Sequence, residues 1–98
     1  MDIHHKKTDH FYKICDSMKE YMSYLSNDQK VFFYALFKQG TVGNAPEEPI
    51  FSDPVTVAKW EAWNKRRYMD CMEAKQIYVN TAVVFLKQVE NKERMKFP

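Results

Sequence analysis

Apolar residues recur at helical spacing near the start of the chain. Between positions 9 and 23 they stand three or one positions apart, at Phe11, Ile14, Cys15, Met18, Tyr21 and Met22. This spacing places them on one face of a helix, and Thr8 or Asp9 can cap its first turn. We therefore predict a helix over residues 9–23, with residues 1–8 forming a flexible tail.

A capping box marks the start of a second helix. Ser26 is followed three positions later by Gln29, and seven consecutive apolar residues occupy positions 31–37. Such a run also suits a buried strand. The cap before it, and Lys38 and Gly40 after it, favour a helix. Because this helix is apolar on all sides, we expect other elements to cover more than one of its faces.

A proline-containing loop separates the second helix from a third. Positions 44–53 contain Pro46 and Pro49, and a loop of this length is often functional. Asp53 can cap the third helix, with Pro54 in its first turn. Its apolar stripe comprises Val57, Ala58, Trp60 and Trp63, and we expect the cations at positions 65–67 in its last turn.

A fourth helix begins after an acidic capping box formed by Asp70 and Glu73. Its apolar face comprises Ala74, Ile77, Tyr78, Ala82, Val83, Val84 and Phe85. The branched residues at 79–84 would suit a strand by propensity alone, but the cap and the length favour a helix reaching about Glu90 or beyond. We therefore predict an all-α fold with one domain over residues 9–91 and a charged tail over residues 92–98.

Composition narrows the classes of protein that these helices can form. Lys and Arg number 15 against 13 Asp and Glu, a net charge of +2 that does not indicate a nucleic-acid-binding protein. No apolar run approaches the length of a membrane span, and the first residues lack the apolar stretch of a signal peptide. Two isolated cysteines then indicate reduced thiols. We expect a cytoplasmic monomer without stable membrane insertion.

Motifs for catalysis or metal binding are missing from the sequence. It contains no glycine-rich phosphate loop, no nucleophile elbow and no paired carboxylates beside a base. No metal-ligand spacing links the histidines at positions 4, 5 and 10 to Cys15 or Cys71. We expect no enzyme, no metal and no cofactor.

Aromatic residues are abundant: the chain has two Trp, six Tyr and seven Phe. Tyr34 and Lys38 are four apart on the second helix, so a phenol and an ammonium share a face and form a donor pair suited to phosphate. On spacing alone, a core Tyr34 with a solvated Lys38 is the commoner arrangement. Lys19, Lys59 and Tyr78 carry no separate signal.

Three stretches in order resemble the acyl-CoA-binding protein family. They are FYALFKQGTVG at 33–43, AKWEAWN at 58–64 and AKQIYV at 74–79. The family pattern is similar to Tyr-x-x-Tyr/Phe-Lys-Gln-x-Thr-x-Gly, then Lys-Trp-x-Ala-Trp-Asn, then Ala-x-x-x-Tyr. The resemblance covers roughly residues 9–86 and points to the small single-domain form of the family.

This resemblance implies an up-down-down-up four-helix bundle with an extended loop between helices two and three. It also implies non-catalytic binding, buffering and transport of medium- to long-chain acyl-CoA esters. The ligand is a bound cargo and not a cofactor. The residues that it implies bind acyl-CoA are Lys19, Tyr34, Ala35, Leu36, Phe37, Lys38, Lys59 and Tyr78.

Within that set, the resemblance implies that Tyr34, Lys38 and Lys59 bind the 3′-phosphate of CoA. It also implies that Tyr78 contacts the head group and that Lys19 lies close to the ligand. Phe37 stands where many members have Tyr, and the resemblance implies that its ring stacks near the adenine. Five further rings are expected to lie mostly in the core, at Phe11, Phe32, Phe33, Trp63 and Phe85.

The acyl-groove candidates are Phe11, Ile14, Cys15 and Val31. Ile14 and Cys15 replace alanines that are common in the family, so they are expected to reshape the groove and the preferred chain length. They also motivate an alternative, a helical protein-interaction module of the same fold that no longer binds acyl-CoA. A third hypothesis, a small nucleic-acid-binding domain, depends on the cations at positions 65–67.

Overall fold

Four α-helices and one short 3₁₀ turn make up the part of the chain that the structure describes. A computed structural model describes residues 3–95, and side chains are described for residues 8–93. The helices are α1 (Ile3–Lys19), α2 (Asn27–Thr41), α3 (Pro54–Asn64) and α4 (Cys71–Met95), and the 3₁₀ turn η1 is Met22–Tyr24. The predicted all-α class is confirmed.

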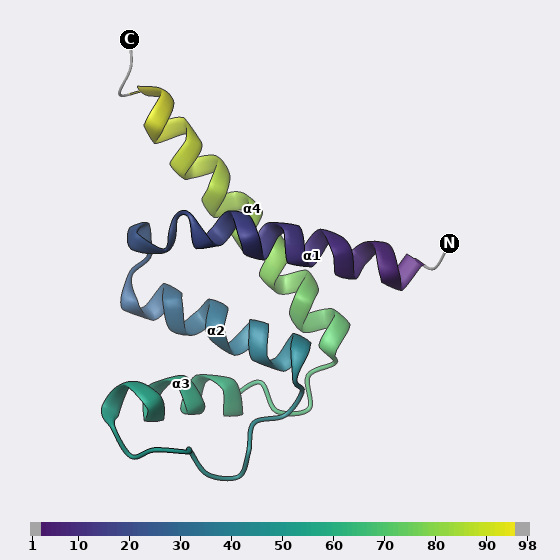
Figure 1. The fold of residues 1–98 in the computed structure, drawn as a ribbon, viewed down its shortest axis with the longest axis vertical. Coiled ribbons are helices and arrows are strands. Elements are labelled where there is room, and N and C mark those ends of the chain that lie inside the picture. The colour runs from purple at the N-terminus through teal and green to yellow at the C-terminus, as the bar shows by residue number, and fades with distance from the viewer. Residues whose placement is uncertain (1–2, 96–98) are drawn as a thin grey trace.

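The four helices run up, down, down and up. Figure 1 shows α2 and α3 side by side and pointing the same way, opposite to α1, with α4 returning behind α1. The helix α2 packs against both α3 and α4, and α1 packs against α4. The central position predicted for α2 is therefore correct, and the extended loop between α2 and α3 passes around the outer edge of the bundle.

Side-chain caps start three of the helices as the sequence predicts. Ser26 and Gln29 form both halves of a capping box, with bonds of 2.8 and 3.1 Å. Asp53 accepts a bond from the Thr56 amide at 3.0 Å. Asp70 accepts bonds from the amides of residues 72 and 73. Each cap satisfies backbone donors that the first helical turn leaves unpaired.

The boundaries predicted for the first helix were wrong at both ends. The helix α1 begins at Ile3, inside the predicted tail, because residues 3–8 include no Gly or Pro to interrupt it. It ends at Lys19, where backbone bonds between residues three apart take over, as from Tyr21 to Met18 at 3.0 Å. This tighter turn brings Leu25, which is 6% exposed, into the core just before the Ser26 cap.

One further boundary differs from its prediction, and the structure defines another that the sequence left open. The helix α3 ends at Asn64, so the cations at 65–67 follow the helix and do not lie in its last turn. The helix α4 extends to Met95, in agreement with an end at about Glu90 or beyond, and it includes the first residues of the charged segment at 92–98. There the Tyr24 hydroxyl donates to Glu93 at 2.7 Å, a contact between segments distant in sequence. Residues 96–98 of that tail lie outside the described part of the chain.

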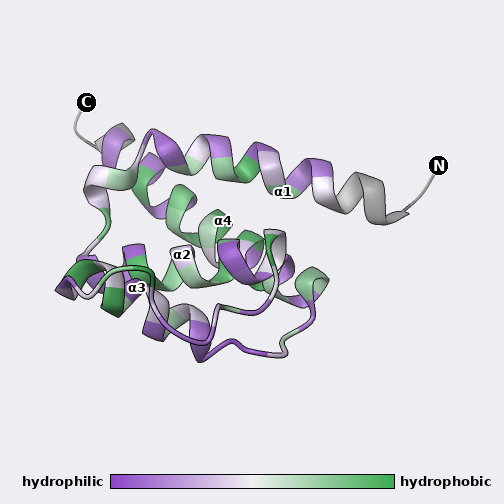
Figure 2. Cartoon of the chain, turned by 60° about the horizontal axis from the view of Figure 1, so that its bottom comes forward, coloured by the Kyte–Doolittle hydropathy of each residue, from purple (hydrophilic) through white to green (hydrophobic). Residues whose placement is uncertain are grey.

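The core lies between α1, α2 and α4. Its buried members are Phe11, Cys15, Met18, Leu25, Phe33, Leu36, Ala74, Tyr78, Val79, Ala82 and Leu86. Figure 2 shows hydrophobic residues concentrated on α2 and α4, and hydrophilic residues along the outer side of α1. A second, smaller cluster of Ala35, Ala45 and Trp63 joins α2 to α3. Val84, predicted on the buried face of α4, is 56% exposed.

A glycine permits the close approach of α2 and α4. A Cβ atom at Gly40 would lie 2.9 Å from the Lys75 side chain and 3.5 Å from the Cys71 carbonyl oxygen. The helices therefore contact each other backbone to backbone at this point. This contact sets the distance between the two helices that carry Tyr34 and Tyr78.

Candidate functional site

Two lysines from different helices converge on one tyrosine ring. The Lys38 ammonium lies 5.9 Å from the centre of the Tyr34 ring, and the Lys59 ammonium lies 5.4 Å from it. Tyr34 and Lys38 are on α2, whereas Lys59 is on α3. The ring attracts both cations electrostatically. The result is a small positively charged surface between two helices of a nearly neutral chain.

Trp63 supports this surface from α3. Its ring contacts the Tyr34 ring edge to face, with centres 6.4 Å apart, and lies 5.6 Å from the Lys38 ammonium. Burial raises the pKa of Tyr34, which favours the protonated phenol. At neutral pH Tyr34 therefore presents a hydroxyl donor beside two ammonium donors, a set suited to a phosphate.

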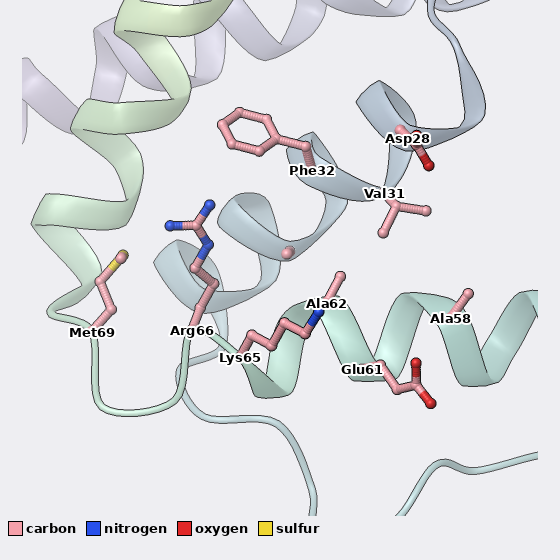
Figure 3. Close-up of a pocket in the computed structure, with 10 residues that line it drawn as sticks. Asp28, Val31, Phe32, Ala58, Glu61, Ala62, Lys65, Arg66 and Met69 are labelled. Carbon is pink, nitrogen blue, oxygen red and sulfur yellow. The ribbon is translucent and has the colours of Figure 1, made fainter.

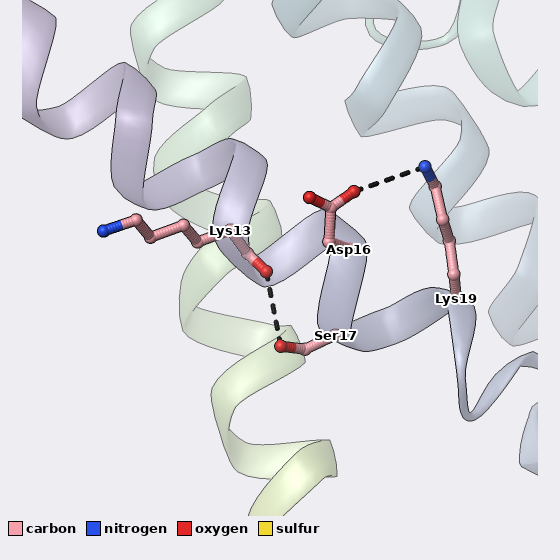
Figure 4. A network of polar contacts seen from close by, with 4 residues as sticks. All are labelled: Lys13, Asp16, Ser17 and Lys19. Carbon is pink, nitrogen blue, oxygen red and sulfur yellow. Dashed lines mark hydrogen bonds and ion pairs between the residues drawn. The ribbon is translucent and has the colours of Figure 1, made fainter.

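An apolar groove of about 230 Å³ opens beside Tyr34. We call it the α1–α2 groove, and it is lined by Cys15, Met18, Lys19, Met22, Lys30, Phe33, Tyr34, Phe37 and Tyr78. Lys19 and Lys30 supply the charged groups of this lining. Figure 4 shows Lys19 at the end of α1 directed toward Asp16, with 3.3 Å between the ammonium and the carboxylate.

Aromatic rings form the floor of the α1–α2 groove. The Phe11 ring stacks on Phe37 with centres 5.9 Å apart and meets Tyr78 edge to face at 5.2 Å. Tyr78 also meets Phe33 edge to face at 5.1 Å. Burial raises the pKa of both Tyr78 and Cys15, so both groups are neutral at neutral pH. The floor is therefore apolar, with one hydroxyl and one thiol.

The structure brings five of the twelve candidate residues together in the groove: Cys15, Lys19, Tyr34, Phe37 and Tyr78. Lys38 and Lys59 join them around Tyr34. Phe11 is fully buried and contacts the groove residues Phe37 and Tyr78 from below, whereas Ile14 is half-buried against the core and does not line the groove. Ala35, Leu36 and Val31 do not line it. Leu36 is fully buried, and the other two line a different hollow.

That second hollow lies between α2 and α3 and measures about 520 Å³. We call it the α2–α3 hollow, and Figure 3 shows its lining residues Asp28, Val31, Phe32, Ala58, Glu61, Ala62, Lys65, Arg66 and Met69. The Arg66 guanidinium lies 5.4 Å from the centre of the Phe32 ring. One of the three consecutive cations is thus packed on an aromatic face.

The next cation, Arg67, holds the loop between α2 and α3. Its Nη2 donates to the carbonyl oxygens of Ala45 and Pro46, at 2.6 and 3.3 Å, and its Nε donates to Asn64 at 2.8 Å. Because Arg66 packs on Phe32, two of the three cations at 65–67 make contacts within the protein itself. This arrangement gives no support to a nucleic-acid surface there.

Both tryptophans also hold this loop. Trp60 donates from Nε1 to the Pro46 carbonyl oxygen at 2.8 Å, and Trp63 donates to that of Gly43 at 2.7 Å. The loop thereby encloses a slot of about 270 Å³, here called the loop slot, lined by Tyr34, Pro46, Pro49, Ile50, Phe51, Thr56, Lys59, Trp60 and Trp63. The loop therefore forms one side of the slot that borders Tyr34.

Sequence reasoning missed four residues of the α1–α2 groove: Met18, Met22, Lys30 and Phe33. A signal for the methionines was present, because positions 15, 18 and 22 share one helical face. Methionine is also a common lining of adaptable apolar sites. Lys30 stands one helical turn before Tyr34 and would have been found by the spacing that paired Tyr34 with Lys38.

Two chemical features are absent from the described residues. No group of three or more His, Cys, Asp or Glu side chains among them is placed to hold a metal ion. In the same part of the chain, no helix is long and apolar enough to cross a membrane.

The fold and this site define a small helical ligand-binding module. The family model described as acyl CoA binding protein matches residues 8–82. The chain therefore belongs to the acyl-CoA-binding protein family, as its motifs predicted.

Individual relatives agree with this assignment. Diazepam-binding inhibitor-like 5 of Rattus norvegicus is 38% identical over 71 residues, which cover 70% of this chain and 80% of the relative. Acyl-CoA-binding protein homolog 1 of Caenorhabditis elegans is 44% identical over 55 residues, covering 55% and 64%. The Acyl-CoA-binding protein homolog of Drosophila melanogaster is 36% identical over 73 residues, covering 74% and 85%. No solved structure gives a significant match.

Proposed function

We propose that this protein binds one medium- to long-chain acyl-CoA ester, and that it buffers and transports this ligand without chemical change. Membership of the acyl-CoA-binding protein family supports the ligand class. The observation that carries the proposal is the convergence of Lys38 and Lys59 on Tyr34. We further propose that it works as a cytoplasmic monomer.

The 3′-phosphate of CoA is the group that this convergence suits. It is a compact dianion above its second pKa of about 6. Hydrogen bonds to charged groups contribute about 1.5–3 kcal/mol each. Two ammonium groups and a neutral phenol can bind one phosphate from three directions. Because Lys38 and Lys59 stand on different helices, only the folded bundle assembles this set.

Aromatic faces beside the phosphate site are suited to stacking on the adenine base. Tyr34 and Phe37 both line the α1–α2 groove, three residues apart on α2. Stacking of a base on an aromatic side chain contributes about 1–3 kcal/mol. The Tyr78 hydroxyl, close to Cys15 in the groove floor, is assigned to the rest of the head group.

The acyl chain is assigned to the apolar part of the α1–α2 groove. Cys15, Met18, Met22 and Phe33 supply that part of the lining. Each buried methylene contributes about 0.8 kcal/mol, so the chain supplies much of the affinity while the phosphate supplies recognition. Cys15 projects into the groove where many members of the family have alanine, and this bulk is expected to affect the preferred chain length.

Titration calorimetry with palmitoyl-CoA tests the proposal. We expect tight one-to-one binding, and much weaker binding of the 3′-dephospho form of the same ligand. An absence of binding at micromolar protein would refute the proposal. Equal affinity for both forms would instead favour the alternative, a protein-interaction module with an apolar groove. Such a groove would bind the acyl chain whether or not the ligand carries the 3′-phosphate.

A further inference from the structure

Trp63 contacts three parts of the molecule at once. Its ring lies 5.6 Å from the Lys38 ammonium and meets the Tyr34 ring edge to face, with ring centres 6.4 Å apart. Its Nε1 donates a hydrogen bond of 2.7 Å to the Gly43 carbonyl oxygen. The side chain is only 9% exposed. Because it is buried and bonded at its nitrogen, its ring is fixed beside Lys38 and Tyr34.

The bond to Gly43 returns to the end of α2 that carries Lys38. The amides of Val42 and Gly43 donate to the Lys38 carbonyl oxygen at 2.8 and 3.1 Å. Gly43 adopts a φ of 103°, in the left-handed region with which glycine commonly ends a helix. Trp63 therefore contacts the Lys38 side chain with its ring, and through Gly43 it also holds the turn that is bonded to the Lys38 backbone.

The two lysines of the phosphate site differ in how firmly they are held. Lys38 is half-buried, and its ammonium lies near two rings, those of Tyr34 and Trp63. Lys59 is exposed, and its ammonium lies near the Tyr34 ring. A lysine stem has many rotamers, and binding a ligand normally costs the entropy of fixing it. The two rings reduce that cost for Lys38 and leave its positive charge available to an anion.

Trp60, three residues earlier on α3, allows the two roles of Trp63 to be separated. Its Nε1 also donates to the loop between α2 and α3, at 2.8 Å to the Pro46 carbonyl oxygen. The ring of α3 that lies near the Lys38 ammonium, however, is that of Trp63. Substitution of Trp60 thus changes the attachment of the loop without removing a ring from Lys38.

We infer that Trp63 is a positioning residue of the phosphate site, which orders the Lys38 ammonium and the Tyr34 ring before the ligand arrives. The identity of the ligand rests on the proposed function. Order in the free protein raises affinity because less conformational freedom is lost on binding. Since Lys38 and Tyr34 are assigned to the 3′-phosphate, Trp63 should affect the binding of palmitoyl-CoA more than that of its 3′-dephospho form.

Titration calorimetry with both ligands tests this inference through the ratio of their affinities. Trp63→Phe removes the Nε1 donor and presents a smaller ring with a weaker attraction for a cation. It should lower the preference for palmitoyl-CoA over the 3′-dephospho form at least fivefold, and Trp60→Phe should leave this preference unchanged. In a Lys38→Ala background, Trp63→Phe should have a much smaller further effect on the preference. A purely structural role would weaken the binding of both ligands equally.

Nuclear magnetic resonance of the free protein provides a measurement that needs no ligand. A methylene group beside the face of an aromatic ring resonates at higher field than one in solvent. The ε-methylene protons of Lys38 should therefore lie at higher field than those of Lys87, which is exposed on α4. Trp63→Phe should move them toward the position of the Lys87 signals, and Trp60→Phe should not.

Three results would overturn the inference. They are Lys38 signals at the position of the Lys87 signals in the wild type, an unchanged ligand preference in Trp63→Phe, and an equal loss of preference in Trp60→Phe. Circular dichroism shows whether each variant retains its helices, and Trp63→Tyr replaces Trp63→Phe if the latter does not. A wild type that fails to bind palmitoyl-CoA would contradict the proposed function, and the Lys38 signals would then decide the inference by themselves.

Discussion

The Lys59 ammonium on α3 lies 5.4 Å from the centre of the Tyr34 ring on α2. This contact joins the two parallel helices of the bundle and, with Lys38, concentrates two positive charges at one place. A net charge of +2 over 98 residues conceals this local feature. The site is thus an electrostatic property of the folded chain.

Substitution of either lysine by alanine should weaken the binding of palmitoyl-CoA. Lys38→Ala and Lys59→Ala each remove one charge-assisted contact to the phosphate, and the expected loss is about 1.5–3 kcal/mol. Titration calorimetry measures it. Lys65→Ala is the matched control, because Lys65 lines the α2–α3 hollow. Wild-type affinity in both site variants would show that the phosphate lies elsewhere.

Removal of the Tyr34 hydroxyl should also weaken binding, while the ring remains to support both lysines. Tyr34→Phe should lose about 1.5–3 kcal/mol for palmitoyl-CoA and much less for the 3′-dephospho form. A double-mutant cycle that combines Tyr34→Phe with the 3′-dephospho ligand measures the coupling free energy between the Tyr34 hydroxyl and the phosphate. A coupling energy of zero would separate Tyr34 from the phosphate.

The stability of the protein should fall in alkaline solution because of Tyr78. Burial raises its pKa above the ordinary value of 10.0, so the native state retains a proton that the unfolded state releases. This contribution is complete below pH 10 and is lost as the pH rises above it. Urea unfolding at pH 8 and pH 10.5 should show a smaller decrease for Tyr78→Phe than for the wild type. Equal decreases would contradict the assignment.

Loss of the Arg67 guanidinium should loosen the loop between α2 and α3. Arg67→Ala removes the donors that hold Ala45, Pro46 and Asn64, and it should destabilise the protein by about 1–3 kcal/mol. Trp60 shares the Pro46 carbonyl oxygen, so its fluorescence should shift to longer wavelength. Lys65→Ala again serves as the control, and unchanged fluorescence in Arg67→Ala would show that Trp60 holds the loop without it.

Glycine at position 68 should stabilise the fold. Tyr68 is 84% exposed and adopts a φ of 70°, in the left-handed region that costs a side chain about 1–2 kcal/mol. After the greater entropy of glycine in the unfolded chain is subtracted, we expect a gain of about 0.5–1 kcal/mol. Thermal unfolding should show a rise of several degrees for Tyr68→Gly. A lower melting temperature would mean that the Tyr68 side chain contributes contacts of its own.

The helices were predictable because their start signals are local. Ser26 with Gln29, and Asp53 with Thr56, are three residues apart, so the sequence alone places them within bonding distance once a helix forms. Helix ends were less predictable. The end of α1 depends on Leu25 entering the core, and the extension of α4 coincides with the contact between Tyr24 and Glu93, 69 positions apart.

The same distinction applies to the site. Tyr34 and Lys38 were paired by their helical spacing, and the motif added Lys59 from another helix. Neither argument revealed that Ala35 and Leu36, inside the same motif, are buried at 1% and 0% exposure. A motif records which residues occur together in a family, whereas burial depends on the face that each one presents to α3 and α4.

By itself, the sequence determined the helical class, the caps and the family of this protein, because these depend on residues within a few positions of each other or on ordered motifs. Only the tertiary structure decided which rings are buried, how Trp60, Trp63 and Arg67 hold the loop, and that Ile50 and Phe51 remain exposed. The loop contacts join residues 14 to 22 positions apart. Such contacts form only when packing has brought separate helices together.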